Sequence, residues 1–309
     1  EITTRLVGSE MCIRDREDAY TLALFAQDEI KLLRNLQALI GVRYIYHENF
    51  KNHATPNVAL MYKPGKFNFR ASYAAGFRTP TLSELYATDI AKKNDRLTIG
   101  NLDLKPEKNN YFSLSAEYVH ERFSVSVNAF YNNIRDMIDY NTIATGDKAM
   151  EQYGHKEVRQ RDNIAEAKVH GINVSANAYL GAGFNLSGGY THLNTQDVEL
   201  EQPIDKSIKN AYNINAQWAH SWKIYRLNIN LNGRINSKRF SKSYGYAPEY
   251  QLWDLNTRHS FNLKSVIIEP GFGMENLFDY MDDRPYNSNY ATLTPGRSFY
   301  ISLSLKFKS

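Results

Sequence analysis

Two sets of side chains in this sequence have the chemistry to hold an anionic ligand. The first is a set of arginines at alternating positions of extended segments, and a guanidinium offers a planar fork of donors: Arg43, Arg70, Arg226, Arg234 and Arg258. The second is a set of tyrosines in or beside two polar segments, whose rings could form an adaptable aromatic surface: Tyr244, Tyr246, Tyr250, Tyr286 and Tyr290. Each set also has a structural interpretation. The arginines could belong to a charge network with Glu117 and Asp254, and the tyrosines could pack within their own segments.

The sequence offers little for catalysis. Its eight histidines show neither HExxH nor His-x-His spacing, so we expect no histidine metal site. It contains neither GxSxG nor GxxxxGK, and we therefore expect no enzyme activity and no cofactor. Asp279, Asp282 and Asp283 could supply oxygen ligands to Ca²⁺. Three carboxylates without the rest of a site are more typical of a solvated loop.

Composition narrows the class of protein that must position these side chains. The chain has 309 residues, and no stretch approaches the ~18 apolar residues that a membrane helix needs. Aromatic residues make up 13%, with 22 tyrosines, which argues against disorder. The net charge of +4 is spread along the chain, so nucleic acid is not an expected partner. A single cysteine, Cys12, excludes a disulfide framework.

Alternation of apolar and polar residues is the dominant pattern from residue 18 onward, and it predicts strands. The last strand shows it best, because one face carries only apolar residues: Phe299, Ile301, Leu303, Leu305 and Phe307. We predict thirteen strands, near residues 18–28, 32–47, 56–63, 66–76, 110–120, 123–136, 160–180, 183–194, 209–219, 222–236, 250–261, 264–278 and 297–307.

The connections between these strands alternate in length. Short links are predicted near 29–31, 64–65, 121–122, 181–182, 220–221 and 262–263, and long ones at 48–55, 77–109, 137–159, 195–208, 237–249 and 279–296. A soluble β-sandwich would also bury one apolar face, and periodicity does not separate the two classes. Long strands, long loops gathered at one end and aromatic residues beside the short turns favour an all-β, antiparallel transmembrane β-barrel.

Residues 6–16 match nothing that follows them. Their sequence, LVGSEMCIRDR, closely resembles a translated sequencing adapter. We interpret residues 1–16 as a non-native segment, in which Cys12 has no function, and residues 17–309 as the β-barrel part.

Several strings resemble the C-terminal barrel of TonB-dependent outer-membrane receptors, in family order. They are LFAQDE at 24–29, GVRY at 41–44, PNVALMYKP at 56–64, SYAAGFRTPTLSELY at 72–86, GNLDLKPEKNN at 100–110, KVHGINVSANAYL at 168–180, ENLFDYMDDRPY at 275–286 and PGRSFYISLSLKF at 295–307. The resemblance implies a barrel of 22 strands, filled by an N-terminal plug, in the outer membrane of a Gram-negative bacterium. The thirteen predicted strands would be its C-terminal part, and we expect them to form an open, curled sheet rather than a closed barrel.

The same resemblance implies a function and a set of partners. The receptor would import a scarce ligand such as a ferric siderophore, haem or cobalamin, with energy relayed by TonB. Its partners would be outer-membrane lipid, its own plug, the TonB complex, the barrel insertion machinery and the small-molecule ligand. The 309 residues contain no segment that resembles the plug or the TonB-contacting box. The polar-face arginines could then contact either the plug or an anionic ligand.

Ten residues of the matching strings are interpreted as structural, at strand ends and turns, and not as ligand contacts: Gly76, Arg78, Pro80, Asn101, Lys105, Pro106, Glu107, Asn276, Phe278 and Asp279. The terminal alternation of Phe299 to Phe307 resembles the signal that the insertion machinery reads. It departs from the usual pattern because Lys308 and Ser309 follow the last aromatic residue.

Three alternatives remain at this point. A TonB-dependent glycan importer usually has LKWE where this sequence has LKPE, so Pro106 argues against it. A passive porin or fatty-acid channel is a second alternative. A soluble adhesive β-protein is the third, and the alternating loop lengths disfavour it.

Overall fold

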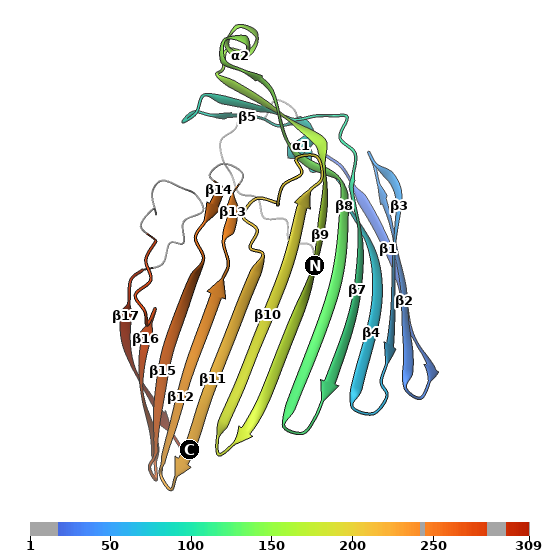
Figure 1. The fold of residues 1–309 in the computed structure, drawn as a ribbon. Coiled ribbons are helices and arrows are strands. Elements are labelled where there is room, and N and C mark those ends of the chain that lie inside the picture. The colour runs from blue at the N-terminus through green and yellow to red at the C-terminus, as the bar shows by residue number, and fades with distance from the viewer. Residues whose placement is uncertain (1–17, 242–244, 283–294, 309) are drawn as a thin grey trace.

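One large curved sheet makes up most of the molecule (Figure 1). The computed structural model describes residues 18–241, 245–282 and 295–308. Thirteen long antiparallel strands follow one another along the sheet: β1 (Thr21–Leu33), β2 (Leu36–His47), β3 (Lys51–Tyr62), β4 (Phe67–Arg78), β7 (Glu107–Val119), β8 (Phe123–Thr145), β9 (Glu157–Gly181), β10 (Phe184–Asp197), β11 (Asn210–Trp222), β12 (Tyr225–Asn236), β15 (Tyr250–Asn262), β16 (Val266–Glu275) and β17 (Ser298–Phe307). The predicted all-β class and the thirteen-strand wall are confirmed.

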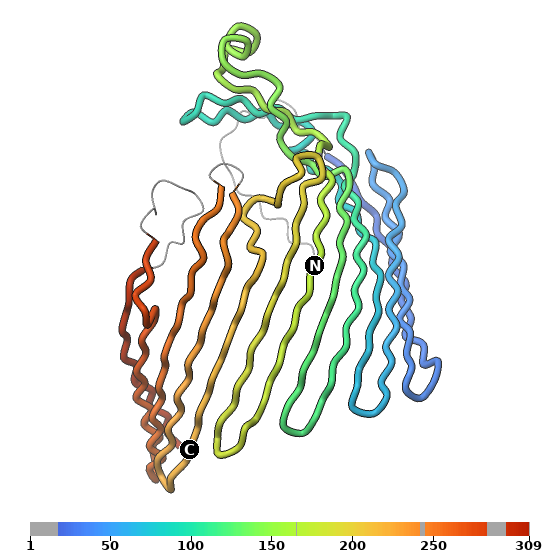
Figure 2. The backbone as a smooth tube through the Cα atoms, viewed as in Figure 1, coloured from blue at the N-terminus to red at the C-terminus, as the bar shows by residue number. Residues whose placement is uncertain are grey.

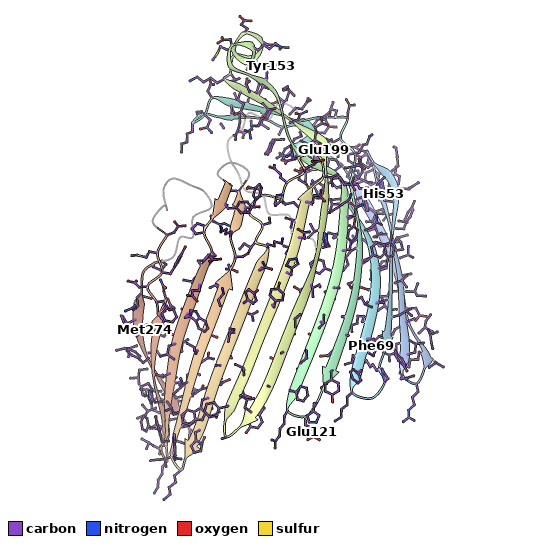
Figure 3. All side chains as sticks on the ribbon, in the orientation of Figure 1. His53, Phe69, Glu121, Tyr153, Glu199 and Met274 are labelled. Atoms are coloured by element: carbon purple, nitrogen blue, oxygen red, sulfur yellow. The ribbon has the colours of Figure 1, made fainter. Side chains whose placement is uncertain are left out.

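The two ends of the strands differ. Tight hairpin turns join the strands at one edge of the sheet, which we call the short-turn edge, and Figure 2 shows them along the bottom. The opposite edge, the loop edge, carries the remaining elements: α1 (Leu82–Tyr86), β5 (Thr88–Ala91), β6 (Arg96–Ile99), α2 (Gly146–Tyr153), β13 (Arg239–Ser241) and β14 (Gly245–Ala247). In Figure 3, Tyr153 and Glu199 lie toward the loop edge and Glu121 lies at the short-turn edge.

The register places apolar and polar side chains on opposite faces, because directly paired residues share a face. Ile301 pairs with Phe272, which pairs with Thr257 on the same face, while Ser302 pairs with Gly271 on the other. On the apolar face the side chains stand free, with Ile301 80%, Leu303 65% and Leu114 62% exposed. Among the described residues, Leu85, Leu104 and Ile138 form a small buried hydrophobic cluster at the loop edge. Other buried apolar residues include Ala38, Ala149, Val158, Ala167 and Ala247. The wall therefore has one face suited to lipid and one suited to water.

The sheet does not close. Within the described residues, β1 pairs with β2 alone and β17 pairs with β16 alone, so each leaves one side of its backbone unpaired. The predicted open, curled sheet is confirmed.

Two predicted connections near the N-terminus are wrong. The first turn lies at residues 34–35 and not at 29–31, because Leu33 pairs with Leu36 and the charged stretch around Asp28 continues the strand. The long loop predicted at 48–55 is a turn of residues 48–50, since His47 pairs with Lys51 and β3 begins there. In both places polar residues stand within a strand rather than in a loop.

The predicted loops at 77–109 and 137–159 contain ordered structure. Strand β8 continues to Thr145 and β9 begins at Glu157, and α2 connects them above the rest of the wall. The pairing of β8 with β9 shifts register between Ile134 and Ile138. Asp136 lies within this irregular segment, and its φ of 56° is in the left-handed region. Within 77–109, β5 pairs with β6, and β6 adds to β9 in parallel.

No helix among the described residues is both long and apolar enough to cross a membrane.

Candidate ligand-facing surface and loop-edge cluster

All five candidate arginines lie on the polar face, but the structure does not bring them into one site. Arg226 and Arg258 are neighbours near the short-turn edge, where Arg226 pairs with Ser260 and Arg258 pairs with Asn228. Arg234 lies toward the loop edge of β12. Arg43 and Arg70 lie on β2 and β4, several strands away. The arginines are therefore spread over the polar face in separate positions.

A hollow of about 370 Å³ surrounds Arg258 on the polar face. Its lining is mainly amide and hydroxyl groups, including Asn228, Asn230, Asn256, Tyr300 and Ser302. The Tyr300 hydroxyl donates to Asn256 Oδ1 at 2.5 Å. The hollow can therefore donate and accept hydrogen bonds around a single guanidinium.

Amide side chains form a second polar feature, which the sequence reasoning missed. Asn215 Nδ2 donates to Asn230 Oδ1 at 2.9 Å and to Asn232 Oδ1 at 2.5 Å, and Gln217 Nε2 donates to Asn228 Oδ1 at 3.3 Å. The asparagines at 228, 230 and 232 were visible as an alternating row. Their partners on β11 depend on register, which that row does not specify.

A hollow of about 420 Å³ surrounds Arg70. Asn68 Nδ2 donates to Glu117 Oε2 at 2.9 Å within it, and Arg70 Nη2 lies 3.4 Å from the sulfur of Met61. Among the interactions described, Arg70 has no contact with a carboxylate. The nearby Glu117 carboxylate already accepts a hydrogen bond from the Asn68 amide.

The tyrosine set is only partly described. Tyr246 is 57% exposed and packs edge-on against Phe240 across the β13–β14 hairpin, with ring centroids 5.3 Å apart. Tyr250 begins β15 and stacks with Tyr280 at 5.7 Å. Tyr244, Tyr286 and Tyr290 lie outside the described residues. The two tyrosines that can be placed both belong to the loop edge.

An ion-pair cluster joins the strand ends at the loop edge. This loop-edge cluster consists of Arg78 at the end of β4, Glu84 in α1 and Glu107 at the start of β7. Arg78 Nε and Nη2 donate to the two oxygens of Glu107 at 2.7 and 2.5 Å, and Arg78 Nη1 donates to Glu84 Oε2 at 2.9 Å. Glu107 Oε1 also accepts from the Ile138 backbone at 2.8 Å. One guanidinium thus connects β4, α1 and β7 through a bidentate contact and a third bond, and Glu107 extends the connection to β8.

The sequence around Glu84 explains why α1 forms. Thr81 is its N-cap: the Thr81 hydroxyl accepts from the Glu84 N–H, and the Glu84 carboxylate accepts from the Thr81 N–H, which is a capping box. Partial burial alone would raise the pKa of Glu84, but hydrogen bonds from Arg78 and Thr81 hold that pKa below its ordinary value. Glu84 therefore serves the helix and the ion pair together.

The other signature residues of this region gather around the same cluster. Pro80 is buried, and a Cβ on Gly76 would collide with Asn109 Oδ1. Asn101 Oδ1 accepts from the Asp103 N–H at 2.9 Å, and the Lys105 N–H donates to Asn163 Oδ1 at 2.7 Å. These contacts are all made with other parts of the chain at or near the loop edge, and the structural role of residues 76–80 and 101–107 stays a prediction.

A second turn at the loop edge depends on Asn276 and Asp279. Asn276 is buried, its Oδ1 accepts from the Tyr280 N–H at 2.8 Å, and its Nδ2 donates to the Tyr280 and Pro295 carbonyls. Asp279 Oδ1 accepts from the Arg297 N–H at 2.7 Å. Phe278 is 61% exposed and touches the ring of Trp253 edge-on. These bonds connect the end of β16 to the segment that enters β17.

A calcium site at this turn gains no support from the part that is described. Asp279 is engaged with the backbone, and Asp283 lies outside the described residues. Among the described residues, no group of three histidine, cysteine or acidic side chains could hold a metal ion.

Replacing Arg78 by Met is expected to destabilise the folded protein by about 1–3 kcal/mol. The change leaves Glu84 and Glu107 close together without their shared cation, and the Arg78 side chain is 44% exposed, which moderates the loss relative to a fully buried pair. The urea midpoint of the folded protein in detergent measures the change in the free energy of unfolding. Arg122→Met, in an exposed short turn, is the matched control and should shift the midpoint little. Equal shifts for the two variants would contradict a structural role for the cluster.

Comparison with known proteins agrees with this architecture. The family model described as "TonB dependent receptor-like, beta-barrel" matches residues 5–277. The chain belongs to the TonB-dependent receptor family.

Solved structures of siderophore receptors share the fold. The siderophore receptor PirA from Pseudomonas aeruginosa is 18% identical, with a TM-score of 0.70 over 94% of this chain and 49% of that one. A mutant of the ferric enterobactin receptor PfeA from P. aeruginosa, in complex with enterobactin, is 21% identical, with a TM-score of 0.73 over 93% and 46%. BauA, the ferric preacinetobactin receptor from Acinetobacter baumannii, is 17% identical, with a TM-score of 0.67 over 94% and 43%. The chain thus spans about half the length of the structures that it matches.

Proposed function

We propose that this chain forms part of the wall of an outer-membrane receptor that imports a ferric siderophore with energy supplied through TonB. The observation that carries the proposal is the two-faced, thirteen-strand wall, whose apolar face carries exposed hydrophobic side chains on strands from β1 to β17. Family membership supports the dependence on TonB. The siderophore class is supported by the similar fold of receptors for such ligands.

In this proposal the apolar face contacts lipid and the polar face lines the lumen. The arginines and the amide-lined hollow around Arg258 then face either the plug or the passing ligand. Ferric siderophores are commonly anionic, and separate guanidinium groups along a polar wall would attract such a ligand without fixing it in one place. Haem, cobalamin or a glycan would pass through the same lumen. Only the identity of the ligand that is taken up distinguishes these alternatives.

The proposal orients the loop edge toward the cell exterior and the short-turn edge toward the periplasm, the usual arrangement of outer-membrane barrels. Lys92→Cys and Asp147→Cys, at the loop edge, should react with an impermeant maleimide on intact cells that express the full-length receptor with Cys12→Ser. Lys66→Cys and Arg122→Cys, at the short-turn edge, should react only after the cells are opened. Labelling with the reverse pattern would overturn the orientation.

Transport is tested in cells that lack their own siderophore receptors. The full-length receptor is expressed with and without a functional TonB, and uptake is measured for iron-59 bound to a catecholate siderophore and to a hydroxamate siderophore. Haem, cyanocobalamin and a maltooligosaccharide are tested in parallel. We expect TonB-dependent uptake of a ferric siderophore. Uptake of only the sugar, or uptake that persists without TonB, would refute the proposal.

A further inference from the structure

A basic cluster stands on the apolar face near the loop edge. It consists of Lys108 on β7, Arg135 on β8 and Lys168 on β9, and we call it the outer-wall basic cluster. Lys108 pairs directly with Arg135, so the two side chains share a face, and Lys168 pairs with Asn133, two residues from Arg135 on that same face. Lys108 belongs to the row that contains Phe112 and Leu114. The cluster is therefore on the lipid-facing side of the wall and not in the lumen.

The charges of the cluster are only partly balanced. Glu166 Oε1 lies 4.0 Å from Arg135 Nε and 3.7 Å from Lys168 Nζ. In the ion pairs of the described residues, Glu166 is the one carboxylate that contacts the cluster. Three cations against one carboxylate leave a positive excess. The Arg135 side chain is 63% exposed and that of Lys168 is 36% exposed, so both can reach a further anion.

A polar row separates the cluster from the apolar band. Asn110 and Asn133 pair across β7 and β8 directly below Lys108 and Arg135. Asn133 is 7% exposed, and its Oδ1 is buried without a hydrogen-bond partner in the structure. The row itself is uncharged, with the positive charge of the cluster above it and the apolar side chains below it.

An apolar hollow lies below that row, on β3, β4, β7 and β8. Its volume is about 540 Å³, and its lining on the apolar face includes Val58, Leu60, Ala71, Leu114, Ala129 and Tyr131. The small side chains of Ala71 and Ala129 form its floor between larger neighbours that stand 38–62% exposed. The upper row of the hollow, Phe112 and Tyr131, lies four residues from Lys108 and Arg135, or about 13 Å along a strand.

We propose that the outer-wall basic cluster and the apolar hollow together bind one phosphorylated glycolipid of the outer leaflet, with its phosphate on Lys108, Arg135 and Lys168 and an acyl chain in the hollow. The charge excess complements a phosphate, and basic residues beside a membrane surface attract anionic headgroups. The headgroup layer of one leaflet is about 5–8 Å thick, so flexible basic side chains above the hollow can reach it. The inference rests on the proposed orientation, which puts the loop edge at the outer leaflet.

Native mass spectrometry of the delipidated full-length receptor tests the proposal with bisphosphorylated lipid A, dephosphorylated lipid A and phosphatidylglycerol as probes. We expect one tightly retained lipid A. The variant Lys108→Gln/Arg135→Gln/Lys168→Gln should bind it at least about tenfold more weakly. The control Lys66→Gln/Arg122→Gln/Lys223→Gln removes the same charges from exposed short turns and should bind like the wild type.

Two further measurements distinguish the contribution of the phosphorylated headgroup from that of the acyl chain. Dephosphorylated lipid A should bind wild type and cluster variant equally weakly, and Ala129→Phe, which fills the hollow, should weaken lipid A binding with the cluster intact. Heat-modifiable mobility confirms that each variant is folded. Equal binding by the cluster variant and its control, or equal affinity for phosphatidylglycerol and lipid A, would overturn the proposal. Siderophore uptake is measured separately, so a failure of the import function leaves the lipid readout intact.

Discussion

Cells that express only residues 17–309 are expected to take up no ferric siderophore. The sheet ends at β1 and β17, each of which has one unpaired side in the described structure. Thirteen antiparallel strands put β1 and β17 in the same direction, so direct closure would require a parallel pair. An open edge in lipid costs several kcal/mol for each unsatisfied backbone group, and bacterial barrels normally close with an even number of strands.

The measurement is iron-59 uptake together with heat-modifiable mobility of the purified membrane fraction. The full-length receptor, expressed to the same level, is the control and should show both uptake and a folded band. Uptake by cells that contain only residues 17–309 would mean that this wall closes or assembles without further strands, and the open sheet would then not describe the protein in the membrane.

Replacing Phe307 by Ala is expected to reduce the outer-membrane level of the full-length receptor to less than half. Phe307 is 81% exposed on the apolar face, at the end of the strand that must pair to complete the wall. Its own packing therefore contributes little to stability, and we expect the loss to arise during assembly. Lys308 continues the pairing past the aromatic residue, because its N–H donates to the Ser265 carbonyl at 3.1 Å.

Phe299→Ala is the matched control for this prediction. It removes the same side chain from the same face of the same strand, and Phe299 is 59% exposed, but it lies at the opposite end. Immunoblots of outer-membrane fractions compare the two variants. If deletion of Lys308 and Ser309 lowered the level while Phe307→Ala did not, the assembly signal would lie in those last two residues.

The strands could be predicted because their pattern is local. Alternation from Ser298 to Phe307 specifies both the extended conformation and the apolar face, and the same reasoning placed Arg43, Arg70, Arg226, Arg234 and Arg258 together on the polar face. The prediction failed where polar residues continue a strand, as at Asp28 and at Lys51. Charged residues are typical of turns but also occupy exposed strand positions, and a single sequence does not separate the two.

Contacts between segments that are distant in the sequence could not be predicted from the alternation of apolar and polar residues. Arg78, Glu84 and Glu107 were each expected near a strand end or loop, but their meeting depends on how α1 folds back over the sheet. The extension of β8 and β9 likewise depends on a register shift near Asp136 and on the addition of β6. Neither leaves a periodic signal in the sequence. The outer-wall basic cluster depends on register in the same way, since its three members come from three strands.

The parallel pairing of β6 with β9 has a consequence for the order of assembly. Every other neighbour along the wall is joined through a hairpin or a single connection, whereas Arg96 pairs with Glu157 across the whole of β7 and β8. That contact encloses a long stretch of chain, and loop closure of this kind is entropically costly until the enclosed strands are in place. The β5–β6 hairpin therefore has no strand to pair with in the sheet until β7, β8 and β9 have formed. We expect it to dock after them and to stabilise these three strands once they are paired.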